Sequence, residues 1–149
     1  MNKNMTRALE ACSNNGREHM ILDGDSIITQ LPGPYDAPLM QSVNLNDKTV
    51  VVSTVAPFGT DEDTFWSVAE FLLDVNQTIA IGSFFIQKGD GVIGFRSGIY
   101  IGDQVLDGDE LRYHLNMGAF AFGRYGREIE NRALAGTPTK GVQSELMYR

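Results

Sequence analysis

A long apolar seam near the C-terminal end of the sequence limits the folds open to this chain. Apolar or small residues recur at alternating spacings of four and three at Leu111, Leu115, Gly118, Phe122, Tyr125 and Ile129. This spacing places them along one side of a helix. Asp107 and Glu110 precede the seam in the arrangement of a capping box, which predicts that the helix begins there.

Three glycines, Gly118, Gly123 and Gly126, lie within this predicted helix. Each glycine costs about 1 kcal/mol relative to alanine in a helix interior. Their presence predicts a close approach of the helix to a neighbouring element, or a helix that bends or breaks near Gly123.

The middle of the chain predicts a sheet. Strands are expected at 19–22, at 26–29, over 41–56 with a turn at 46–48, and over 79–101. Asp23-Gly24-Asp25 and Lys88-Gly89-Asp90-Gly91 suit the tight turns of two hairpins, because Asp and Gly tolerate positive φ. Residues 31–38 hold three of the five prolines and predict a loop.

Two further helices are expected. One is short and covers residues 6–13. The other is opened by Thr60 as its N-cap, and three acidic residues follow at the positive end of the helix dipole. Its apolar side is broad, with Phe65, Ala69, Leu72 and Asn76 in one line and Trp66 and Leu73 in a second.

At 149 residues the chain has the size of one domain, expected over residues 1–136 with a C-terminal tail at 137–149. The predicted order is a helix, three or four strands, a helix, two strands and a helix. Helices segregated on an antiparallel sheet are the α+β pattern. The sequence therefore predicts an α+β fold with helices packed on an antiparallel sheet.

Charge and composition exclude several classes of function. The net charge is −7 and the basic residues are scattered, whereas nucleic-acid and anionic-membrane binding need clustered Lys and Arg. No segment has the roughly 18 apolar residues of a membrane span. Cys12 is the single cysteine, so no internal disulfide forms, and residues 1–16 lack the apolar core of a signal peptide. A cytoplasmic location is expected.

No catalytic, cofactor or metal site is expected either. His19 and His114 lie in different predicted elements, and with Cys12 they fall short of the four ligands of a structural zinc site. The Asp-Gly clusters lack the ligand spacing of an EF-hand, so turns and caps explain them. Cys12 lies on the apolar side of a short helix, where cysteine is usually a small hydrophobe.

The chain has more large apolar side chains than one core face needs. The candidate protein-binding or dimer surface consists of Phe65, Trp66, Leu73, Phe84 and Phe120. An exposed apolar patch would indicate a partner or a dimer. The alternative is that all five are buried within a domain with layers on two sides, and the sequence leaves both open.

The run from Thr60 onward resembles the YbjN-like domain, which shares its fold with type III secretion chaperones. The matching features are a helix ending in Leu72-Leu73 and Asn76, then Gly82-Ser83-Phe84, Gly91-Val92, Phe95-Arg96, a closing helix after Leu106 to Leu111, and Leu134-Ala135-Gly136-Thr137-Pro138. The resemblance implies the order α-β-β-β-α-β-β-α, no enzymatic activity and no cofactor. It also implies an acidic cytoplasmic homodimer that holds a partner segment, or a link to regulation or stress. The first helix departs from the leucine-rich first helix of secretion chaperones.

The sequence therefore predicts a non-enzymatic protein-binding or regulatory module, YbjN-like or secretion-chaperone-like, that holds a protein partner on an apolar surface. The partner would pair with a free sheet edge or dock beside the helix that carries Trp66. Two alternatives stay open: a small enzyme with an unrecognised cleft, and a structural subunit of a larger assembly.

Overall fold

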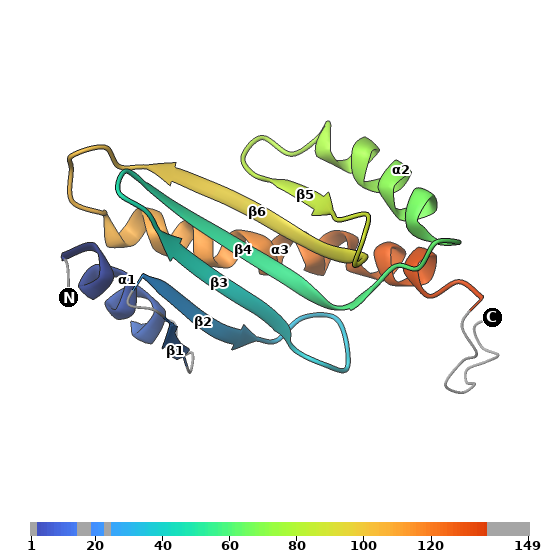
Figure 1. Ribbon diagram of the computed structural model, residues 1–149, viewed down its shortest axis with the longest axis horizontal. Helices are drawn as coiled ribbons and strands as arrows, with labels where there is room; N and C mark the ends of the chain where they lie inside the picture. Colours follow the sequence, from blue (N-terminus) through green and yellow to red (C-terminus); the bar gives the residue numbers. More distant parts are fainter. Residues whose placement is uncertain (1–2, 15–18, 23–24, 137–149) are drawn as a thin grey trace.

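The structure is a computed structural model that describes residues 3–14, 19–22 and 25–136. The described residues form three helices and six strands (Figure 1). The helices are α1 (Lys3–Asn14), α2 (Phe65–Asn76) and α3 (Gly108–Ala133). The strands are β1 (His19–Leu22), β2 (Ser26–Leu31), β3 (Leu39–Leu45), β4 (Thr49–Gly59), β5 (Ser83–Ile86) and β6 (Val92–Tyr100). The predicted tail at 137–149 lies outside the described residues.

The strands form one antiparallel sheet in the order β1-β2-β3-β4-β6-β5. The predicted α+β class and the order of helices and strands are confirmed. Four strands precede the middle helix, where the residue patterns predicted three or four and the family resemblance implied three. The added strand is the short β1, which pairs with β2 and lengthens the sheet at one edge.

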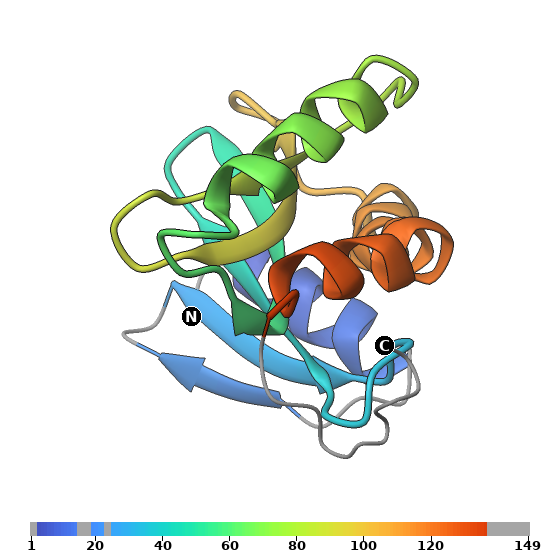
Figure 2. The same cartoon turned by 90° about the vertical axis from the view of Figure 1, so that its right-hand side faces the viewer.

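All three helices pack on the same side of the sheet (Figure 2). Residues along each strand alternate between the two faces, so in β3 Gln41, Val43 and Leu45 are buried under the helices. Ser42 and Asn44 point to the opposite face and are partly exposed. Because the helices share one side, no helix of the described chain covers the other face. We call that second side the open face.

Helix α3 confirms the predicted seam. The Asp107 carboxylate accepts a hydrogen bond from the Asp109 N–H at 2.9 Å, as an N-cap does. The helix then runs for 26 residues without a break. Gly118 lies so close to Thr54 that no β-carbon would fit, whereas Gly123 has open space around it. Of the two explanations predicted for the glycines, the close approach is the one that the structure shows.

Helix α2 begins later than the sequence predicts. Thr60 was expected to be its N-cap, but the residue that precedes the helix is Thr64. Thr60 instead continues the β4 strand region, where its N–H donates to the Gly91 carbonyl at 3.0 Å. The Asp61 carboxylate accepts from the N–H groups of Asp63 and Thr64, both at 2.9 Å. The acidic segment therefore forms a turn before the helix rather than its first turn.

Asn76, the last residue of α2, connects the helix to β5, the strand at one edge of the sheet. Its side-chain nitrogen donates to the Phe84 carbonyl at 3.0 Å, and its side-chain oxygen accepts from the Phe84 N–H at 2.8 Å. Phe84 belongs to β5, which pairs with β6 on its other side. One amide therefore satisfies both backbone groups of Phe84 at the sheet edge. We call this pair of hydrogen bonds the Asn76 clamp.

The Asn76 clamp gives a stability prediction. In Asn76→Asp the carboxylate can still accept from the Phe84 N–H but cannot donate to the Phe84 carbonyl. We expect the free energy of unfolding, measured by urea titration, to fall by about 1–3 kcal/mol. Gln77→Glu makes the same chemical change at the next, exposed residue and is the control. Equal losses in the two variants would show that added negative charge, and not the clamp, is responsible.

Candidate functional site

Two large apolar side chains stand out from the free side of α2. Trp66 is 65% exposed and Leu73 is 66% exposed. They lie seven residues apart, so they share one side of the helix. Phe65 is partly buried, and its ring meets the Trp66 ring edge to face at a centroid distance of 5.0 Å. Lys88 adds a cation–π contact, with Nζ 5.1 Å from the Trp66 ring centre. We call Phe65, Trp66 and Leu73 the α2 strip.

The other two predicted surface residues lie elsewhere. Phe84 is 3% exposed, so its assignment to a surface is wrong. It points inward from β5 and packs against Phe95 and Phe122, with ring centroids 5.2 and 5.3 Å away. Phe120 is 73% exposed, but it belongs to α3 and lies opposite the buried seam of that helix. The structure therefore brings together three of the five predicted residues.

Acidic residues surround the α2 strip. Residues 60–77 contain no Lys, Arg or His, and their acidic side chains, all on exposed residues, are Asp61, Glu62, Asp63, Glu70 and Asp74. The hydrogen bond from the Thr64 backbone holds the pKa of the Asp61 carboxyl below its ordinary value. The Asp61 carboxyl therefore stays ionised near neutral pH. The strip is apolar with a mainly negatively charged border, and the cations near it are Lys88, over the Trp66 ring, and Arg132, which donates to the Ser67 carbonyl.

The sheet edge at β5 is a poor place for an added strand. The Asn76 clamp already occupies both outward backbone groups of Phe84. Strand addition needs a row of such groups left unpaired. The prediction was that a partner pairs with a free sheet edge or docks beside α2, and the Asn76 clamp argues against pairing at the β5 edge.

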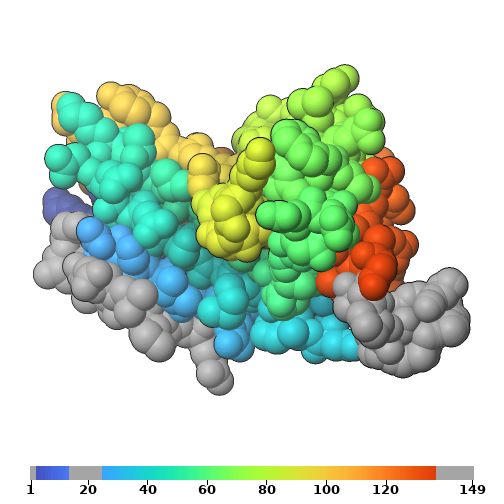
Figure 3. All heavy atoms as spheres, turned by 45° about the vertical axis from the view of Figure 1, so that its right-hand side comes forward, coloured from blue at the N-terminus to red at the C-terminus, as the bar shows by residue number. Residues whose placement is uncertain are grey.

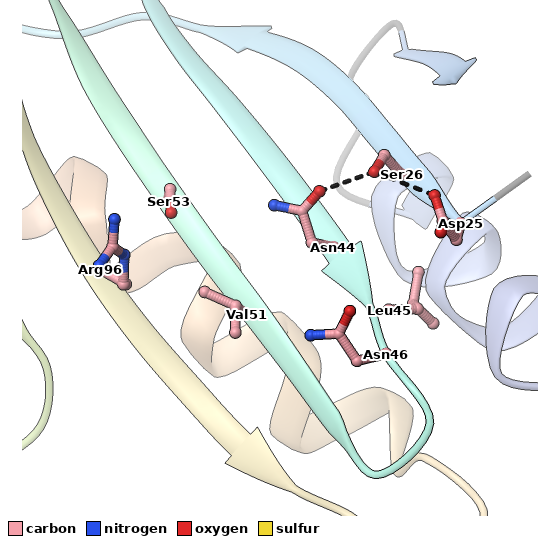
Figure 4. Close-up of a pocket in the computed structure, with 8 residues that line it drawn as sticks. All are labelled: Asp25, Ser26, Asn44, Leu45, Asn46, Val51, Ser53 and Arg96. Carbon is pink, nitrogen blue, oxygen red and sulfur yellow. Dashed lines mark hydrogen bonds between the residues drawn. The ribbon is translucent and has the colours of Figure 1, made fainter. Parts of the chain in front are cut away.

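A hollow of about 460 Å³ opens on the open face of the sheet. In Figure 3, α2 (green) stands away from the turquoise end of the β3–β4 hairpin, and no residue of α2 lines the hollow. The lining side chains come from four neighbouring strands and include Ser26, Asn44, Asn46, Val51, Ser53 and Arg96 (Figure 4). The sequence analysis missed this site. Its signal was the set of polar residues at outward positions of three strands, namely Ser42 and Asn44 in β3, Ser53 in β4 and Arg96 in β6.

The one histidine with a described side chain is buried. His114 Nδ1 lies 2.8 Å from the Ser97 hydroxyl, and both residues are buried between α3 and β6. Burial lowers the pKa of the His114 imidazole below its ordinary value, although nearby Glu110 opposes the shift. A serine–histidine pair can activate a nucleophile, but a substrate must reach it. This pair does not line the hollow on the open face.

The remaining chemical candidates add little. Cys12 belongs to α1 and is buried in the core, as expected of a small hydrophobe. Within the described ranges, no three His, Cys, Asp or Glu residues gather closely enough to hold a metal ion. No helix in the same ranges is long and apolar enough to cross a membrane. The side chain of His19 lies outside what the structure describes.

The buried imidazole gives a pH prediction. Because the folded-state pKa of His114 is lowered, its stabilising contribution is complete above the unfolded-state pKa of about 6.5 and is lost as the pH falls below it. We expect the free energy of unfolding of the wild type, minus that of His114→Gln, to be constant from about pH 7 to 8 and to decrease below about pH 6.5. The subtraction cancels the pH dependence that comes from the carboxyl groups common to both proteins. Parallel stability curves would contradict the assignment.

Comparison with known proteins places the fold. No protein-family model matches the chain, and no curated protein matches it. Among solved structures, it matches the crystal structure of YbjN from E. coli, described as a proposed transcription regulator, with a TM-score of 0.61 at 12% sequence identity. The match covers 83% of this chain and 92% of the YbjN chain. Identity this low shows the fold alone. The resemblance that the residues after Thr60 suggested is confirmed at that level: the chain has a YbjN-like α+β fold.

Proposed function

We propose that this chain is a cytoplasmic, non-enzymatic protein-binding module that acts in regulation, with the α2 strip as its docking surface. The observation that carries the proposal is the exposure of Trp66 and Leu73 on one side of α2. Each buried Å² of apolar surface contributes about 25 cal/mol, so covering these side chains favours association. Tryptophan is also enriched among the residues that dominate binding energies.

The acidic border of the strip defines the kind of partner. Basic side chains flanking an apolar segment would pair with Glu70 and Asp74 while the segment covers Trp66 and Leu73. Such charges mainly set the rate and specificity of association. The same acidity disfavours nucleic acid, because phosphates would meet carboxylates. The regulatory role is supported by the fold shared with YbjN, and we propose that it is exercised through protein contacts rather than DNA contacts.

A homodimer is the second occupant to consider for this surface. A two-fold contact would place the same strip on both sides of the interface. It would also bring the acidic borders of two α2 helices together. The resulting electrostatic repulsion would be screened by salt. A homodimer should therefore strengthen with salt, whereas a complex with a basic partner should weaken with salt. If the chain is instead a structural subunit of a larger assembly, it would bind its neighbour through the same surface. Identifying that neighbour would distinguish this alternative.

The proposal predicts which surface residues matter. Trp66→Ala and Leu73→Ala should each weaken association by at least about tenfold. Both should leave the free energy of unfolding within about 0.5 kcal/mol of the wild type, because neither side chain is in the core. Phe120→Ala removes an equally exposed aromatic side chain from α3 and should have no effect on association.

The measurements are sedimentation velocity of the purified chain at low and high salt, and quantitative capture of partners from the native cell with each variant. Loss of one captured protein with both α2 variants and its retention with Phe120→Ala supports the proposal. Equal behaviour of all three variants, or a monomer with no variant-sensitive partner at either salt, overturns it.

A further inference from the structure

Three side chains with hydrogen-bond donors, from three neighbouring strands, line the hollow on the open face (Figure 4). Arg96 lies on β6, and Ser53 is its direct neighbour across the β4–β6 ladder. Asn44 lies on β3, where it pairs with Val51, so it is the diagonal neighbour of Ser53. Diagonal neighbours on one face of a sheet lie about 7–8 Å apart, so Ser53 stands between Arg96 and Asn44 along the hollow.

The three donors are not used by the described part of the protein. The Asn44 side-chain oxygen accepts from the Ser26 hydroxyl at 2.7 Å, which leaves the amide nitrogen to point towards β4. The Ser53 hydroxyl makes no hydrogen bond to a described residue. No described carboxylate lies within ion-pair distance of Arg96, whereas Arg112 and Arg132 on α3 are both paired.

The Arg96 side chain is also held in place. Its guanidinium carbon lies 4.5 Å from the centre of the Phe85 ring, on the neighbouring strand β5. Stacking on an aromatic face restricts the guanidinium before any ligand arrives, so less entropy is lost on binding. The planar fork of donors on arginine matches the oxygens of a carboxylate or phosphate.

We infer that this hollow binds a small ligand that carries an oxyanion, with Arg96 and Ser53 as the donors to the oxyanion and Asn44 as a donor to another polar group of the ligand. The volume of about 460 Å³ is in the range of small-molecule sites. The oxyanion must lie at the Arg96 end, because Asp25 borders the opposite end of the hollow. Carboxylate and phosphate groups share this chemistry, and the experiment separates them. The site is on a different face from the α2 strip and does not depend on the proposed function.

The test is an NMR titration of the full chain with sodium acetate and, separately, with inorganic phosphate, at constant ionic strength set by sodium chloride. We expect saturable shifts of the Arg96 Nε–H and of the Ser53 backbone amide, which lie at the end of the hollow away from Asp25. Saturation by one probe identifies the class of oxyanion, and saturation by both shows that the site accepts either. The absence of saturable shifts with both probes overturns the inference.

Matched variants test the donors. Arg96→Gln should weaken binding of the active probe by at least about tenfold, because a charged hydrogen bond is lost. Arg124→Gln is the control, since Arg124 is also exposed and stacked, 5.5 Å from the Tyr125 ring, but lies on α3. Ser53→Ala keeps the charge and should weaken binding by a few-fold, which keeps the test valid if Arg96→Gln is unstable. Equal weakening by Arg124→Gln would show a general effect of charge and contradict the site.

Discussion

The contact between α3 and the middle of the sheet is the interaction on which the rest of the structure depends. Gly118 offers only a hydrogen atom at the point where α3 meets Thr54, so the helix can lie close to β4. Gln41 crosses the same contact, and its side-chain nitrogen donates to the Leu115 carbonyl at 2.8 Å and to the Thr54 hydroxyl at 3.0 Å. A buried amide with both hydrogens bonded fixes where α3 lies along the sheet, as well as its distance from the sheet. The α3 helix then provides the surface on which α1 and α2 pack.

This one-sided packing explains why the molecule has two kinds of surface. The helices bury one face of the sheet in two apolar clusters, one around α1 and one around α2. The open face carries hydroxyl, amide and guanidinium groups between its apolar residues, and the hollow lies there. The outward side of α2 carries apolar side chains with an acidic border. A ligand with an oxyanion and a protein with a basic, apolar segment would therefore meet different parts of the same domain.

The fold could be predicted further than the surfaces. Strand alternation, the Lys88-Gly89-Asp90-Gly91 turn and the seam of α3 report local backbone geometry and one-sided burial, and each predicted the correct element, whereas residues 23–24 of the other predicted turn lie outside the described residues. The start of α2 could not be placed from the sequence, because Thr60 and Thr64 are the same residue type, and the contacts that separate them are the hydrogen bond from Thr60 to Gly91 and the turn held by the Asp61 carboxylate. Phe84 and Phe120 are both phenylalanines that the sequence assigned to a surface, but Phe84 faces the core and Phe120 faces solvent. The donor set of Arg96, Ser53 and Asn44 depends on strand register, which a single sequence does not reveal.

The Asn76 clamp has a consequence for the order of folding. It joins residues only eight apart, so closing that loop costs little chain entropy. The neighbouring β5–β6 hairpin is equally local, because its strands are joined by a short turn. Pairing of β4 with β6 must instead wait for the whole α2–β5 segment to fold back across the sheet. We expect α2, β5 and β6 to form a unit that acquires protection from hydrogen exchange before the centre of the sheet closes.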